Sequence, residues 1–167
     1  MESNAKKRKA ILKRNLIKAG IRDMRSIGEY YYSFTIETIT GNNLIMIAGL
    51  FEDALIMRCD LEIEVNVKDK SIMSTLAEYL HRLNYAIKLF MFELDYETEE
   101  IWLSASTQYY NVFPESEAYK DMIDSISNIV DCLSGSIVEI VTGNCKDAKT
   151  AYDNIRLKYS NEQALSK

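Results

Sequence analysis

Five stretches of the chain have the hydrophobic pattern of β-strands. In four of them apolar and polar residues alternate, which is typical of a strand with one buried and one exposed face. The remaining one, residues 44–50, is almost entirely apolar. The sequence TGNN at residues 40–43 predicts a tight turn before it, because Gly and Asn tolerate positive φ. The predicted strands are residues 30–37, 44–50, 55–67, 89–96 and 101–105.

Four other stretches have apolar residues three and four positions apart, which predicts amphipathic helices. The first ends at Gly20, a residue suited to a left-handed helix terminator. Asp69 or Ser71 is the candidate N-cap of the second, and Asn144 is the candidate N-cap of the last. The predicted helices are residues 4–19, 72–87, 115–141 and 144–159.

The third predicted helix is the longest, and a single apolar stripe follows most of its length. Gly135 lies inside it and allows a bend or close packing against a neighbour. The stripe is predicted to consist of Tyr119, Met122, Ile126, Ile129, Leu133, Ile137 and Ile140.

The order of these elements predicts an α+β fold, because strands joined by hairpins form an antiparallel sheet that helices can cover on one face. The predicted order is α-β-β-β-α-β-β-α-α, with about five strands. We expect one domain over residues 1–167. Its parts are a leading helix at 1–19, a core at about 20–143, an extra C-terminal helix at 144–159 and a polar, frayed tail at 160–167.

Composition supports a globular protein, with 47% apolar and 27% charged residues. No apolar run approaches the roughly 18 residues of a membrane span, and the N-terminus lacks the apolar region of a signal peptide. We therefore expect a cytoplasmic protein. The three cysteines, Cys59, Cys132 and Cys145, are too widely spaced for a CxxC zinc pair and are expected to be buried or idle thiols.

Charge is distributed unevenly along the chain. Residues 1–18 hold seven basic residues against Glu2 alone, a net charge of +6, which leaves −11 for the rest of a chain whose net charge is −5. The basic helix is predicted either to lie against the acidic body or to contact a polyanion such as nucleic acid. Nucleic acid is the less favoured partner, because no aromatic residue is interleaved with the charges. The candidate polyanion contacts are Lys6, Lys7, Arg8 and Lys9.

No pattern in the sequence indicates a catalytic residue, a cofactor or a metal. The single histidine, His81, lies off the apolar stripe of its helix and leaves a zinc site without enough ligands. Glu93 and Asp95 share one strand face, and Glu62 and Glu64 share another, but both pairs are interpreted as the solvated side of the sheet. The spacing of an EF-hand, a phosphate-binding loop or a nucleophile elbow is absent. We expect a protein that is not an enzyme.

Trp102 is a large aromatic residue at a strand position where the alternation predicts a polar one. By alternation it lies opposite Ile101 and Leu103, on the face that also carries Ser104 and Ser106. A large aromatic side chain on a polar face is a candidate partner contact. The alternative is that it packs under a loop or the edge of a helix.

The segment HRLNYAIKLFMFELDYETEEIWL, residues 81–103, resembles the central motif of the YbjN-like bacterial proteins, which are described as sensory transduction regulators. In that family a helix ending in an R-x-N pattern leads into a strand like F-E-L-D and a hairpin, and the resemblance extends less specifically over residues 45–143. The matching residues are His81, Arg82, Asn84, Tyr85, Phe92, Glu93, Leu94, Asp95 and Ile101.

This resemblance implies a fold similar to that of class I type III secretion chaperones, a curved antiparallel sheet packed by helices and often dimeric. The chain departs from the family pattern at Ala86, Phe90 and Met91, where glycines are common, and at Thr98 and Glu99, where an Asp-Gly pair often closes the hairpin. We expect a wider turn at the hairpin, because neither Thr98 nor Glu99 accepts positive φ readily. Phe90 and Met91 are expected to enlarge an apolar contact surface.

Three hypotheses about function follow. The leading one is a non-enzymatic, chaperone-like or regulatory module, a homodimer that holds a polypeptide partner through Trp102, Phe90 and Met91. The alternative is a small signalling or transcription-linked regulator that uses the basic N-terminal helix. The third is an enzyme of unrecognised type that uses Glu93 or Asp95, for which a raised carboxylate pKa would be the indication.

Overall fold

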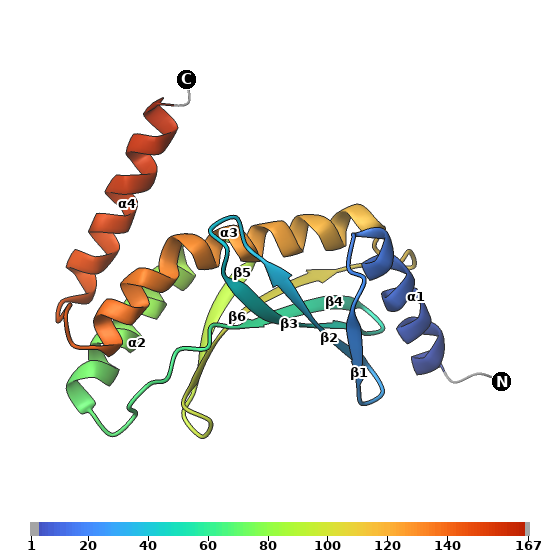
Figure 1. Cartoon of the computed structure of the whole chain (residues 1–167), viewed down its shortest axis with the longest axis horizontal. Coiled ribbons are helices and arrows are strands. Elements are labelled where there is room, and N and C mark those ends of the chain that lie inside the picture. Colours follow the sequence, from blue (N-terminus) through green and yellow to red (C-terminus); the bar gives the residue numbers. More distant parts are fainter. Residues whose placement is uncertain (1–3, 166–167) are drawn as a thin grey trace.

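The computed structural model describes the backbone of residues 4–165 and the side chains of residues 4–157. It contains one six-stranded antiparallel sheet and four helices (Figure 1). The strands are β1 (Met24–Ile27), β2 (Tyr31–Glu37), β3 (Asn43–Leu50), β4 (Ala54–Asp60), β5 (Phe90–Asp95) and β6 (Glu100–Gln108). The helices are α1 (Asn4–Lys18), α2 (Lys70–Ala86), α3 (Ser116–Val141) and α4 (Ala148–Leu165).

The predicted α+β class and antiparallel sheet are confirmed, with one strand more than the predicted order contains. The strands lie side by side in the order β1-β2-β3-β4-β6-β5, so that β6 is inserted between β4 and β5. The additional strand, β1, has only four residues, and its sequence MRSI is too short to show a clear alternation. It pairs with the first half of β2 and forms one edge of the sheet.

The long alternating stretch at residues 55–67 is a strand only as far as Asp60. The left-handed backbone of Glu62, with φ of 52°, interrupts the extended conformation. On both sides of Glu62 the chain still follows β6, because the amide of Leu61 donates to the carbonyl of Ile101 and the amide of Val65 donates to the carbonyl of Glu99. Leu61 and Val65 are buried. The alternating pattern therefore predicted the burial of these two residues correctly, although the strand β4 ends at Asp60.

Helices α1, α2 and α3 cover one face of the sheet, whereas α4 packs on α2 and α3 and projects away from the sheet (Figure 1). In Figure 1, α3 crosses the sheet along its length, α1 lies at one end and α2 at the other. The buried line of α3 differs from the predicted stripe at two positions, because Ile123 and Val130 are buried where Met122 and Ile129 were expected. Gly135 is exposed and no atom lies within 4 Å of a Cβ built on it, which rules out close packing at this glycine.

Capping was predicted correctly for α2 and wrongly for α4. The carboxylate of Asp69 accepts hydrogen bonds from the amides of Ser71 and Ile72, as an N-cap should. Asn144 does not cap α4. The amide of Cys145 donates to the carbonyl of Glu139, so this segment still belongs to the end of α3.

The N-terminus of α4 is capped instead by Asp147, whose carboxylate accepts from the amide of Thr150 at 2.9 Å. The helix then continues to Leu165, beyond the predicted end at residue 159. Most of the predicted polar tail is therefore helical in its backbone, while residues 166 and 167 lie outside the described part of the chain.

The tip of the β2–β3 hairpin is attached to α3 by a group of short polar contacts. The hydroxyl and amide of Thr40 both donate to the Asp131 carboxylate, and the amide nitrogen of the Asn42 side chain lies 3.4 Å from it. Desolvation alone would raise the pKa of Asp131, but the hydrogen bonds from Thr40, Thr38 and Asn42 outweigh it and hold the pKa below its ordinary value. The ionised carboxylate thus stabilises the folded state.

This contact predicts a pH-dependent contribution to stability. A carboxylate whose pKa is lower in the folded than in the unfolded chain stabilises the fold above the unfolded pKa, about 4, and loses that effect as the pH falls through the folded pKa. We expect Asp131→Asn to be less stable than the wild type at pH 7 and the difference to shrink below about pH 4. Urea unfolding from pH 7 to pH 3 measures this, and a difference that does not change with pH would contradict it.

Candidate functional site

The sheet face opposite the helices is open, and its side chains form rows that cross the strands. One row joins Ile27, Tyr31, Gly49, Ile56 and Ser106, each opposite the next on the neighbouring strand. The next row joins Arg25, Ser33, Ile47, Arg58, Ser104 and Met91. The third joins Thr35, Ile45, Asp60, Trp102 and Glu93. The first row is the most apolar of the three, and the second contributes Ile47 and Met91.

A groove of about 1000 Å³ lies over these two rows. One wall is formed by Ile27 and Tyr31 at the β1–β2 hairpin, and the other by the connection between α2 and β5. The floor is supplied by β3, β4 and β6, from Ile47, Ile56, Arg58, Ser104 and Ser106. The second wall contains Asn84, Tyr85, Ile87, Lys88, Leu89, Phe90 and Met91. This is a long, open site with a mostly apolar lining.

The second wall carries three strongly exposed apolar side chains. Tyr85 is 91% exposed, Leu89 80% and Met91 54%. The backbone of Leu89 is also left-handed, with φ of 70°, which is unfavourable for a non-glycine residue. A strained backbone that holds an apolar side chain in water has no evident benefit for folding, and such sites are often functional.

Trp102 is held on the open face by its neighbours. The Arg58 guanidinium lies 4.9 Å from the centre of its ring, within the range of a cation–π contact. The indole nitrogen donates to the Glu100 carboxylate at 3.1 Å. Arg58 in turn forms an ion pair with Glu93, at 2.5 Å, and donates to the Ser104 hydroxyl at 3.1 Å. Trp102 therefore borders the groove through Arg58 and does not pack under a helix.

The two other predicted contact residues, Phe90 and Met91, lie on opposite faces. Met91 is opposite Ser104 on the open face and lines the groove. Phe90 is opposite Ala105, and its side chain packs against the core. Consecutive residues of a strand alternate between faces, yet both residues line the groove, Met91 from the open face and Phe90 while partly packed against the core.

Gly49 gives the groove its shape and was not identified from the sequence. A Cβ at this position would lie 2.7 Å from the ring of Tyr31, its cross-strand neighbour. The ring can lie across the strand only because residue 49 has no side chain. The Phe51 ring also contacts the Tyr31 ring edge-on, with centroids 5.6 Å apart.

Asn84 joins the end of α2 to the outer edge of β5. Its side-chain amide donates to the carbonyl of Phe92 at 2.9 Å, and its side-chain oxygen accepts from the amide of Phe92 at 2.7 Å. These two bonds occupy one residue of an otherwise open strand edge and position the α2–β5 wall. The preceding Arg82 forms an i,i+4 ion pair with Glu78, and His81 is exposed as predicted.

The hairpin between β5 and β6 has a four-residue connection, Tyr96 to Glu99, which confirms the expected wider turn. Glu99 has φ of 61°, however, so one of the two residues expected to avoid positive φ adopts it. The Asp95 carboxylate accepts from the amides of Glu97 and Thr98 and stabilises the turn. These bonds lower the pKa of Asp95, the opposite of what a general acid at neutral pH requires.

The four basic residues proposed as polyanion contacts are in different environments. The Lys9 ammonium donates to the Ser26 hydroxyl at 2.7 Å and to the carbonyl of Gly28, and it lies 5.2 Å from the centre of the Tyr32 ring. It therefore fastens α1 to β1. Arg8 is half-buried, whereas Lys6 and Lys7 are exposed. The four side chains do not form one exposed patch.

The cysteines and the possible metal ligands remain to be located in the structure. Cys59 is buried in the sheet, where desolvation raises its pKa to about 12 and keeps the thiol neutral. Among residues 4–157, whose side chains the structure describes, no group of three or more His, Cys, Asp or Glu residues is arranged to hold a metal ion. Within the described backbone of residues 4–165, no helix has the length and apolar character needed to cross a membrane.

Comparison of the chain with protein-family models, with curated proteins and with solved structures finds no match. The resemblance of residues 81–103 to the YbjN-like proteins therefore stays a prediction. The site is defined by its own geometry: a long apolar groove on an open sheet face, with Trp102 and a group of carboxylates along one side.

Proposed function

We propose that the chain is a non-enzymatic, chaperone-like or regulatory module that holds a polypeptide partner in the groove of the open face. The observation that carries this proposal is the exposure of Tyr85, Leu89 and Met91 along one wall of a groove of about 1000 Å³. Exposed apolar groups that gather on one surface are typical of protein-binding sites. The groove is at the upper end of the volumes of small-molecule pockets, about 300–1000 Å³, and its length favours a polymer.

Two further features support this assignment. The element order is compatible with the type III secretion chaperone-like fold that the YbjN-like resemblance implies. The three cysteines are free, which is common in a reducing compartment and agrees with the cytoplasmic location that we propose.

The proposal is tested by affinity capture with the tagged full chain from a lysate of its source organism. We expect Met91→Glu to reduce the amount of the captured partner by at least tenfold, because it places a charge in the apolar wall. Trp102→Ala is expected to weaken capture less. Val138→Glu is the matched control, since Val138 is 42% exposed on α3, away from the open face.

Thermal unfolding of each variant separates lost binding from lost folding. Capture that Met91→Glu and Trp102→Ala leave unchanged would contradict the groove as the binding site. Capture that Val138→Glu abolishes equally would show that the contact lies elsewhere.

We also propose a homodimer, as the family resemblance implies. Light scattering at micromolar concentration is expected to give twice the chain mass of 19.2 kDa. A mass near that of one chain would contradict the dimer without affecting the groove.

The alternative function, a regulator that binds nucleic acid through α1, rests on the exposed basic residues Lys7, Lys13, Arg14 and Lys18. Deletion of the helix is a poor test, because α1 supplies buried residues to the core. Charge reversal of Lys7 and Lys13 is the sharper one. If nucleic acid is the partner, salt-dependent binding should weaken on reversal; no binding to DNA or RNA at low salt would dismiss this alternative.

A further inference from the structure

The floor of the groove limits what kind of polypeptide it can hold. β3, β4 and β6 each pair with a strand on both sides, so their backbone groups are already engaged in the sheet. A segment that lies across them meets side chains only. An extended peptide would leave its own backbone groups without partners on an apolar surface, whereas a helix satisfies them internally.

The length of the groove also fits a helix. It runs across the strands from Ile27 on β1 to Met91 on β5, the two edge strands of the sheet. Five interstrand spacings of about 4.8 Å give about 24 Å, which a helix of about 16 residues spans.

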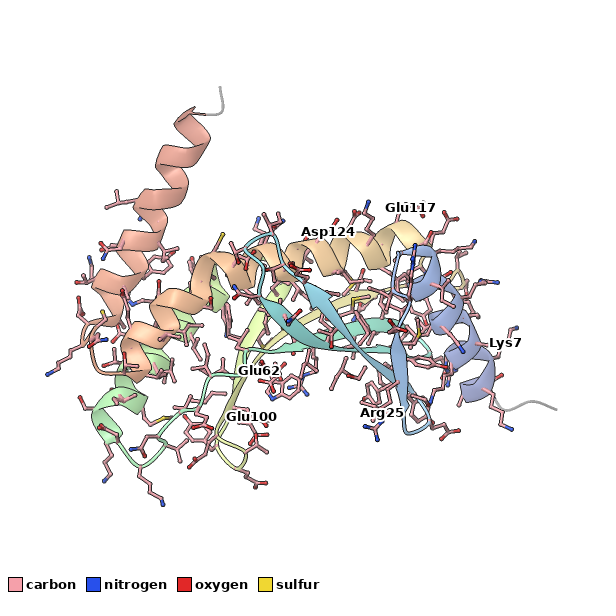
Figure 2. All side chains as sticks on the ribbon, viewed as in Figure 1. Lys7, Arg25, Glu62, Glu100, Glu117 and Asp124 are labelled. Carbon is pink, nitrogen blue, oxygen red and sulfur yellow. The ribbon has the colours of Figure 1, made fainter. Side chains whose placement is uncertain are left out.

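One side of the groove is acidic over β4, β6 and β5. Beyond the row that contains Arg58 and Met91 lie Asp60 and Glu93, which flank Trp102, and then Asp95 and Glu100, which are directly opposite each other. Glu62 joins them, because the segment after β4 is hydrogen-bonded to the start of β6. Figure 2 shows Glu62 and Glu100 on these neighbouring segments, away from Lys7 and Arg25. We call Asp60, Glu62, Glu93, Asp95 and Glu100 the acidic margin.

The acidic margin is not balanced by the base beside it. Arg58 is already paired with Glu93 and stacked on Trp102, and these five carboxylates with one guanidinium carry a formal charge of −4. Like charges placed opposite each other on neighbouring strands, as in Asp95 and Glu100, are destabilising. A basic side chain laid along this margin would relieve that repulsion.

We propose that the groove binds an amphipathic helix of a partner protein, with its apolar side on the groove and a flank of Lys or Arg residues along the acidic margin. This inference rests on the proposed polypeptide-binding function and specifies the conformation and charge of the bound segment. The charges set the orientation of the helix, and the apolar contacts supply most of the affinity.

The test uses labelled 16-residue amphipathic helical peptides and fluorescence anisotropy with the full chain. One peptide has Leu on one side and Lys on one flank, the second has Glu in place of Lys, and the third has Ser in place of Leu. We expect the Leu/Lys peptide to bind about tenfold more tightly than the Leu/Glu peptide at low salt, with a smaller ratio at 0.5 M salt, because salt screens exposed charges.

Paired variants locate the effect. Asp60→Asn with Glu100→Gln is expected to reduce the preference for Lys severalfold, since it removes two charges while both side chains keep an acceptor oxygen. Asp121→Asn with Asp124→Asn removes the same charge from exposed positions on α3 and is expected to leave the preference unchanged.

Each other outcome overturns a different statement. Equal binding of the Leu/Lys and Leu/Glu peptides, both weakened by Met91→Glu, would overturn the basic flank and leave the polypeptide groove in place. Tight binding of the Ser/Lys peptide would overturn the apolar docking and indicate electrostatic attraction alone. Binding of none of the peptides, together with capture insensitive to Met91→Glu, would overturn both this inference and the proposed function.

Discussion

Replacing Leu16 by alanine is expected to lower the free energy of unfolding by about 2–5 kcal/mol, the usual range for Leu→Ala at a fully buried site. Leu16 and Leu12 have no exposed surface although they lie on the basic leading helix. They belong to the same core as the residues of α3 and the sheet. The apolar face of α1 is thus part of the folded core, and most of its basic residues lie on the opposite, exposed face of the helix.

Urea unfolding measures this effect, with Ile17→Ala as the matched control. Ile17 is the next residue of the same helix and is 52% exposed, so its truncation should change stability by about 0.5 kcal/mol or less. If Leu16→Ala were as mild as Ile17→Ala, α1 would not be docked in solution. The basic helix would then be free to contact a partner, which would favour the nucleic-acid alternative.

The elements that the sequence predicted best are those whose burial follows a regular period. The alternation in β6 placed Ile101 and Leu103 in the core and Trp102 on the open face, and all three positions agree with the structure. Of the two candidate N-caps of α2, Asp69 and Ser71, the structure shows Asp69 as the cap. In these segments one face is buried along the whole element, so the hydrophobic pattern predicts directly which residues are buried.

The failures occurred where hydrogen bonding and burial do not coincide. The chain after Asp60 remains partly buried but leaves the ladder at Glu62, and β1 pairs through four residues with little burial of their own. Phe90 and Met91 are adjacent apolar residues, and only the pairing of β5 with β6 decides which of them lies on the open face.

The groove itself could not be predicted from local pattern. It forms because β6 lies between β4 and β5, which places the α2–β5 connection opposite the β1–β2 hairpin across the open face. Sequence indicated Trp102 and Met91 individually, but not that Ile27, Ile56 and Leu89 complete the same surface. The absence of a side chain at Gly49 also acquires meaning only once Tyr31 is known to lie against it.

The segment that resembles the YbjN-like motif contributes mainly to this geometry. Asn84, in the last turn of α2, fastens the helix to β5, and the residues after it form the exposed wall with Tyr85 and Leu89. In this chain the segment thus connects α2 to β5 and sets the position of a groove wall.

Replacing Asn84 by alanine is expected to lower the free energy of unfolding by about 1–3 kcal/mol, since two hydrogen bonds at about 0.5–1.5 kcal/mol each are lost. The amide and carbonyl of Phe92 would be left at the edge of the sheet, where they can pair with another chain. We therefore also expect increased aggregation on heating. Asn84→Asp should be destabilising as well, because a carboxylate cannot donate to the Phe92 carbonyl and repels it.

Urea unfolding and light scattering during heating check this prediction, with Arg82→Ala as the control from the same turn of α2. The Arg82–Glu78 pair is an exposed i,i+4 pair, and such pairs contribute only about 0.3–0.5 kcal/mol. If Asn84→Ala were no more destabilising than Arg82→Ala, the attachment to β5 would not hold the wall. In that case the peptide affinity of Asn84→Ala should equal that of the wild type, whereas a wall released from β5 should bind less tightly even at temperatures where the variant is fully folded.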